Sequence, residues 1–315
     1  MPTVLGQNQY GKAETRVVRV TRDGPVHRIR DLNVSVALSG AMDDVHLSGS
    51  NARVLPTDTT KNTVFAFAKE YGIAAPEDFA MRLARHFVTG QESIRTARIR
   101  VDEYAWDRIA TPGPGEHSFV RRGRETRTAQ VTFDGAGGRW QVLSGLKGLT
   151  VMNTTDSEFH GYVKDRYTTL PETRDRILAT EVNACWRHAW DGGGDSHGNS
   201  HGSGGRDGAA PPDWDGSWER TRGHLLAAFA ETYSLSLQQT LYAMGSRAVE
   251  HGPGIDEIRL SLPNKHHFLA DLEPFGLDND NEVYYAADRP YGLIEATVLR
   301  DGAEAAVPQD LTNLP

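Results

Sequence analysis

The sequence predicts an α+β fold built from two copies of one unit, each with the order strand, strand, helix, helix, strand, strand. Apolar residues alternate with polar ones in several segments, helical spacing interrupts this alternation within each half, and both halves follow the same order. When two helices pack on one face of an antiparallel sheet, the opposite face is left without a layer that buries its apolar side chains. We therefore expect several sheets to close into a barrel in an oligomer, which would bury that face and remove free edges.

In the first half, the turn signal Asp23-Gly24 separates two strands, and two helices follow before alternation resumes. Thr57 or Asp58 is the expected cap of the first helix, because such side chains accept from free backbone N–H groups. Gly90 ends the second helix. The predicted strands cover residues 15–22, 32–38, 97–101 and 126–133, and the predicted helices cover 58–71 and 76–90.

The second half repeats this order, with Ser236 as the expected cap of its second helix. Its predicted strands cover residues 149–152, 178–186, 258–262 and 293–299, and its predicted helices cover 218–233 and 236–249. The join near residues 143–148 divides the chain into a first unit, 1–145, and a second unit, 146–315.

A segment rich in Gly, Ser and His, residues 192–212, is expected to be a flexible surface insertion in the second unit. His197 and His201 within it could hold a metal ion, but zinc sites usually have three or four fixed ligands. We therefore predict no metal site there.

Charge and cysteine content exclude several classes of protein. The net charge of −8 argues against a nucleic-acid partner. The one basic cluster is interpreted as a solvated loop or strand edge; it contains Arg121, Arg122, Arg124 and Arg127. Cys185 is the only cysteine, so an intrachain disulfide is impossible, and we interpret it as a structural thiol. Signal-peptide, membrane-spanning and peroxisomal patterns are missing from the sequence, and a cytoplasmic protein is expected.

Five short segments contain more polar and charged residues than their place in the fold alone would explain. In a structural interpretation, Lys12 is a surface cation and residues 56–62 only cap a helix, although a helix N-terminus also suits an anion. Arg176 could bind a planar anion with Phe159 as stacking surface, and the amide of Gln238 could recognise a lactam edge. The segments are Tyr10-Gly11-Lys12, residues 56–62, residues 159–178, Ser236–Thr240 and Leu262–Phe268.

In this order and spacing, the segments closely resemble the urate oxidase (uricase) family, from Tyr10-Gly11-Lys12 to the segment 290–294. The combination of Thr-Asp-x-x-Lys-Asn at 57–62 and Leu-Pro-Asn-Lys-His at 262–266 is the most specific part. The resemblance implies the tunnelling fold (T-fold), a homotetramer with strand barrels, active sites at subunit interfaces, and no metal, flavin or other cofactor. The missing peroxisomal tail points to a bacterial-type member.

The resemblance also implies a site. Its catalytic residues would be Lys12, Thr57 and His266. Its substrate-binding residues would be Thr57, Asp58, Phe159, Leu170, Arg176, Leu237, Gln238 and Asn264, with Thr57 and Asp58 supplied by the neighbouring subunit.

The expected reaction joins urate, O2 and water to give 5-hydroxyisourate and H2O2. Arg176 and Gln238 would clamp opposite edges of urate, and Phe159 would stack on its ring. Lys12 and Thr57 would form a dyad that takes a proton from the urate anion, because a lysine that loses water at an interface accepts a proton more readily.

Two other functions are alternatives to urate oxidation. A pterin-type enzyme of the same fold would need a convergent His/Cys cluster and typically a Glu that anchors the ligand. An inactive purine-binding homologue would have an intact clamp and a broken dyad, whereas here Lys12, Thr57 and His266 are all present beside Arg176 and Gln238.

Overall fold

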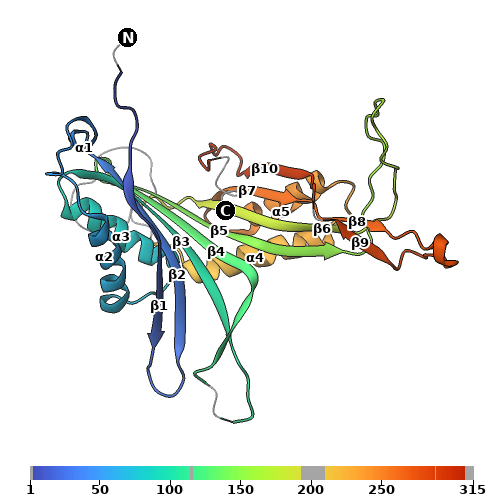
Figure 1. Ribbon diagram of the computed structural model, residues 1–315, viewed down its shortest axis with the longest axis horizontal. Helices are drawn as coiled ribbons and strands as arrows, with labels where there is room; N and C mark the ends of the chain where they lie inside the picture. Colours follow the sequence, from blue (N-terminus) through green and yellow to red (C-terminus); the bar gives the residue numbers. More distant parts are fainter. Residues whose placement is uncertain (1–2, 114–115, 193–209, 288, 309–315) are drawn as a thin grey trace. The chain divides into compact units, whose positions relative to one another are not determined.

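The structure is a computed structural model that describes residues 3–113, 116–192, 210–287 and 289–308. Among these residues, the main sheet is antiparallel and has eight strands in the order β1-β2-β3-β4-β5-β6-β7-β10, while β8 and β9 form a separate hairpin (Figure 1). The α+β class predicted from the sequence is confirmed. Most of the insertion predicted at 192–212, with His197 and His201, lies outside the described residues.

The chain divides into two compact units. The first contains Met1–Gly145 and Arg187–Trp218, and the second contains Leu146–Trp186 and Glu219–Pro315. Elements of the first unit are β1 (Tyr10–Thr21), β2 (Arg28–Gly40), α1 (Asp44–Leu47), α2 (Thr57–Glu70), α3 (Pro76–Gly90), β3 (Ile94–Arg108), β4 (Phe119–Asp134) and the start of β5 (Arg139–Asn153).

Helix α3 shows why the first unit folds as predicted. Pro76 occupies its first position, where a missing N–H costs nothing. Phe79, Leu83 and Phe87 follow at helical spacing and are all buried. They belong to the same buried cluster as alternating residues of the sheet such as Ile99. The core of the unit therefore lies where this face of α3 packs against the apolar face of β2, β3 and β4.

The start of α2 differs from the prediction. The N-cap is Pro56, without a side-chain cap bond, and Thr57 and Asp58 are the first two helical residues. Pro56 has the extended backbone angles that a cap requires, and its carbonyl accepts from the N–H of Thr60 at 3.2 Å. The side chains of Thr57 and Asp58 are therefore not used as helix caps.

Strand β1 is irregular at Lys12. A β-bulge shifts its register against β2 between Lys12 and Thr15, and Glu14 has a positive φ of 56°. A Cβ atom at Gly11 would lie 1.8 Å from the carbonyl oxygen of Val36, so only glycine fits there. Bulges re-aim side chains and are common beside active sites.

The second unit repeats the strand and helix order of the first, as predicted. The side chain of Ser236 caps α5 by accepting from the N–H of Gln239 at 3.2 Å. Helix α4 begins at Trp214, four residues before the predicted start, and the β8–β9 hairpin was not predicted. The elements of the second unit are the end of β5, β6 (Leu178–His188), α4 (Trp214–Glu231), α5 (Leu237–His251), β7 (Ile255–Pro263), β8 (His266–Leu269), η1 (Glu273–Phe275), β9 (Tyr284–Ala287) and β10 (Leu293–Leu299). The last residues of β6 and the first turn of α4 belong to the first unit.

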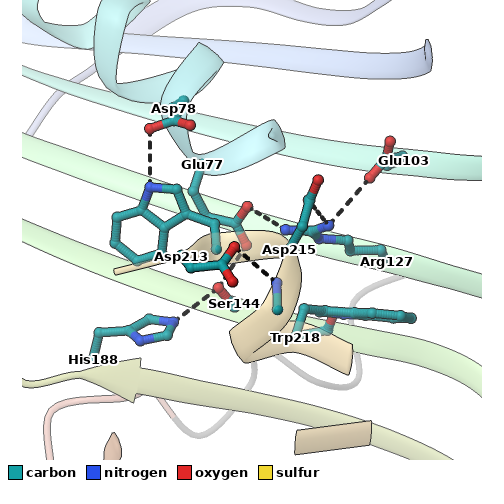
Figure 2. A network of polar contacts seen from close by, with 12 residues as sticks. Glu77, Asp78, Glu103, Arg127, Ser144, His188, Asp213, Asp215 and Trp218 are labelled. Carbon is teal, nitrogen blue, oxygen red and sulfur yellow. Dashed lines mark hydrogen bonds and ion pairs between the residues drawn. The ribbon is translucent and has the colours of Figure 1, made fainter. Parts of the chain in front are cut away.

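A buried polar network lies inside the first unit (Figure 2). Arg127 of β4 donates to Glu77 of α3 at 2.7 Å and pairs with Asp215 in the first turn of α4. The hydroxyl of Ser144 donates to Glu77 at 2.6 Å, so its other contact, with Nε2 of His188 at 3.0 Å, needs a proton on Nε2. The interpretation of Arg127 as a solvated residue was wrong, because its side chain is 8% exposed and ion-paired.

His188 makes the stability of this unit depend on pH. Burial, and then the charge of Arg127, lower the pKa of His188 from 6.5 to about 4. Because the unfolded chain binds this proton more tightly, the His188 contribution to stability is complete above about pH 6.5 and is lost as the pH falls toward 4. The maximum effect is roughly 3 kcal/mol.

Urea unfolding of the wild type and His188→Gln from acidic to neutral pH measures this effect. Gln keeps a donor close to the position of Nε2 but does not titrate. We expect the free energy of unfolding of the wild type to rise with pH relative to the variant across the interval between the two pKa values. Parallel pH profiles for the two proteins would show that His188 is not responsible.

Candidate functional site

The residues predicted for the site fall into two groups, one in each unit. The first unit holds Lys12, Thr57 and Asp58. The second unit holds Phe159, Leu170, Arg176, Leu237, Gln238, Asn264 and His266. Each group is described by itself.

Arg176 is the central cation of the second-unit group. Its guanidinium carbon lies 5.2 Å from the centre of the Phe159 ring, and its Nε donates to the hydroxyl of Ser157 at 3.2 Å. Partial burial lowers the pKa of Arg176. Among the described residues, no carboxylate lies within ion-pair distance of this guanidinium. A desolvated cation with free donors and an aromatic ring beside it suits a planar anionic ligand.

Two buried serines connect Arg176 to the start of α5. The carbonyl of Ser157 accepts from the Arg176 N–H at 2.9 Å, and Ser157 pairs with Ser234 in an isolated bridge. The hydroxyl of Ser234 donates to the carbonyl of Ser236, the cap of α5, at 3.2 Å. Leu237 and Gln238 are the first residues of that helix, with Leu237 buried and Gln238 exposed.

Asn264 lies beside the start of β6, a strand that begins two residues after Arg176, and His266 follows Asn264 in the chain. Asn264 forms a bridge with Thr180, and the N–H of the next residue, Lys265, donates to the Ala179 carbonyl at 2.8 Å. His266 opens β8, and burial, then the charges of Arg176 and His267, lower its pKa. The charge of Arg176 therefore acts on His266, which favours the neutral imidazole.

Leu170 is joined to Phe159 through Tyr162. The rings of Phe159 and Tyr162 are stacked with centres 4.9 Å apart, and the Tyr162 hydroxyl donates to the Leu170 carbonyl. Backbone hydrogen bonds in both directions pair Phe159 with Thr173, at 2.8 and 3.0 Å. These contacts hold the loop that carries Leu170 against the segment that presents Phe159.

In the first-unit group, the start of α2 lies close to Lys12. The carboxylate of Asp58 accepts from Lys61 at 2.5 Å and from Asn62 at 2.9 Å. These contacts lower the pKa of Asp58, with the Lys61 hydrogen bond as the largest cause and the charge of Lys12 as a smaller one. Thr57 precedes Asp58 and is half-buried at the first position of the helix.

Sequence reasoning did not identify Ser157, Ser234 or Tyr162 as residues that contact the predicted site residues or their neighbours in the chain. Small hydroxyl residues between elements are common in any loop, so their spacing carries no signal of a contact with Arg176. Among the described residues, no group of three or more His, Cys, Asp and Glu side chains could hold a metal ion. In the same part of the chain, no helix is both long and apolar enough to cross a membrane.

Known proteins are similar to this chain in sequence and in fold. Residues 8–132 and 142–295 match the family described as Uricase. Uricase from Arthrobacter globiformis is 50% identical over 305 residues, which cover 97% of this chain and 93% of that protein. The chain belongs to the uricase family. Uricase from Emericella nidulans is 38% identical over 302 residues, covering 93% of this chain and 96% of the relative.

A solved uricase has the same fold along the whole chain. The crystal structure of uricase from Arthrobacter globiformis has a TM-score of 0.87 and 49% identity, and the match covers 98% of this chain and 99% of that one. Membership of the family, predicted from the motifs, is confirmed. Uricase is urate oxidase, so the chain is an oxidoreductase.

Proposed function

We propose that this protein oxidises urate with O2 and water to 5-hydroxyisourate and H2O2, without a metal or an organic cofactor. Urate loses two electrons, O2 gains two electrons and two protons, and the oxygen of water is added to the purine ring. The observation that carries the proposal is the Arg176 guanidinium, partly desolvated beside Phe159 and without a described carboxylate partner.

Arg176 and Gln238 hold the substrate in this proposal. The planar guanidinium binds one edge of the urate anion with two parallel hydrogen bonds, and the Gln238 amide supplies a donor and an acceptor to the opposite edge. Phe159 stacks on the ring. Leu170, the backbone of Leu237 and the N–H of Asp58 complete the contacts, and the helix N-terminus at Asp58 stabilises added negative charge.

Lys12 and Thr57 act as base and proton relay. Urate is already an anion at neutral pH, and a second deprotonation makes it a better electron donor to O2. Thr57 passes the proton to Lys12, which sits at the β-bulge of β1. Asn264 and a neutral His266 position O2 and then water above the ring.

We also propose that the complete site forms in a homotetramer of two T-fold units per chain. One subunit would supply Arg176, Phe159 and Gln238, and its neighbour would supply Thr57 and Lys12. A barrel of strands would cover the sheet face that the helices leave open.

Binding of a non-oxidisable urate analogue tests the clamp. Arg176→Ala removes hydrogen bonds to a charged ligand and is expected to weaken analogue binding by about 10- to 100-fold. Arg174→Ala is the matched control, since Arg174 lies in the same segment but is exposed and pairs with Glu158. Isothermal titration gives the dissociation constants. Equal affinities for Arg176→Ala and Arg174→Ala would contradict the assignment of Arg176.

A further inference from the structure

Tyr10 joins the two backbone segments that carry the proposed dyad. Its hydroxyl accepts a hydrogen bond from the backbone N–H of Leu55 at 3.0 Å. Tyr10 lies two residues before Lys12 on β1, and Leu55 lies two residues before Thr57 at the start of α2. One hydrogen bond therefore joins the two segments, each at a position two residues before a member of the proposed dyad.

The surroundings make this link rigid. The side chains of Tyr10 and Leu55 both pack against the buried core of the first unit. On the Lys12 side, Gly11 approaches the Val36 carbonyl so closely that no larger residue fits. Within the bulge, the Glu14 N–H donates to the Ser35 hydroxyl at 3.0 Å, which ties this part of β1 to β2. Lys12 is thus held from both sides.

The Leu55 end of this hydrogen bond is also held in place by the backbone. The extended backbone of Pro56 directs the chain into α2, so the position of Leu55 determines where Thr57 begins the helix. Tyr10 reaches neither Thr57 nor the ε-amino group of Lys12 by any hydrogen bond between described residues. Its effect on the dyad must therefore come through the backbone.

We propose that Tyr10 is a positioning residue of the oxidation reaction, whose hydrogen bond to Leu55 fixes the separation of Lys12 and Thr57 needed for proton relay. The inference rests on the proposed function of that dyad. A small displacement of a base costs rate because proton transfer requires hydrogen-bond distance. Arg176 and Gln238, which hold the substrate in the proposed function, lie outside the two segments that this link joins.

Tyr10→Phe tests the inference because it keeps the ring in the core and removes only the hydroxyl. We expect kcat to fall by about three- to ten-fold, while the Kd of a non-oxidisable urate analogue changes much less, because Arg176 and Gln238 make the main contacts. A solely structural function would lower Tm and leave kcat per folded site unaltered. Tyr242→Phe, on the exposed side of α5, is a matched control that should leave both quantities unchanged.

A double-mutant cycle with Lys12→Ala separates this inference from the proposed dyad. If Tyr10 acts through Lys12, the hydroxyl deletion should have no further effect on the residual turnover of Lys12→Ala. Equal loss in both backgrounds, or an unchanged kcat for Tyr10→Phe, would overturn the inference. Unchanged turnover of Lys12→Ala would instead reject the dyad itself, whatever Tyr10→Phe shows.

Discussion

Lys12→Ala is expected to lower turnover by about 10²- to 10⁴-fold, the usual contribution of a positioned general base. Lys12 lies at the bulge of β1, near enough to the first turn of α2 for its charge to act on Asp58. Without it, the proton relayed by Thr57 has no acceptor. Binding of a non-oxidisable analogue should survive, because the proposed clamp belongs to Arg176 and Gln238. Steady-state kinetics and analogue titration measure the two effects.

Lys69→Ala is the control for this experiment. Lys69 lies in the last turn of the same helix and is exposed, so its removal makes the same change in net charge away from the proposed site. Its turnover should equal that of the wild type. If Lys12→Ala also kept full turnover, Lys12 would not be the base.

Arg127→Ala is expected to destabilise the protein by about 3–5 kcal/mol, because it leaves a buried charge without its partner. The carboxylate of Glu77 is fully buried and pairs with Arg127 at 2.7 Å, and the same guanidinium binds Asp215. Burial raises the pKa of Glu77, and the charge of Arg127 is the largest effect that opposes this rise. Urea unfolding followed by circular dichroism measures the loss.

Arg122→Ala provides the comparison on the same strand. Arg122 pairs with Asp107 at the surface, where an ion pair contributes at most about 1 kcal/mol. The double variant Glu77→Gln with Arg127→Met should lose less free energy of unfolding than the sum of the losses of the two single variants, since it removes both charges together. Equal stability of Arg127→Ala and Arg122→Ala would show that the network is not important for folding.

Local chemistry was sufficient to predict most of the elements. The alternation of β6 and the helical spacing of Phe79, Leu83 and Phe87 each bury one face, so the pattern predicts the element. Ser236 caps α5 as expected. The cap of α2 was not predicted, because Pro56 supplies the required backbone angles without the side chain of Thr57 or Asp58.

Long-range contacts could not be read from the sequence. Arg127 belongs to an arginine-rich stretch that suggests solvent exposure, yet its partners Glu77 and Asp215 are 50 and 88 residues away. Ser157 and Ser234 are similarly remote from each other in the chain. The residues proposed for the site come from the resemblance to a family, and the hydrogen bonds that position Arg176 became visible only in the folded chain.

Urate consumption in chelator-treated, air-saturated buffer, with H2O2 assayed in parallel, tests whether the protein oxidises urate without a cofactor. Ultraviolet absorbance follows the loss of urate. We expect that urate is lost, that equimolar H2O2 appears, and that neither the chelator nor added metal ions or flavin change the rate. Urate loss that stops with the chelator and returns with an added metal ion or flavin, or a folded protein that binds an analogue without consuming urate, would contradict this expectation.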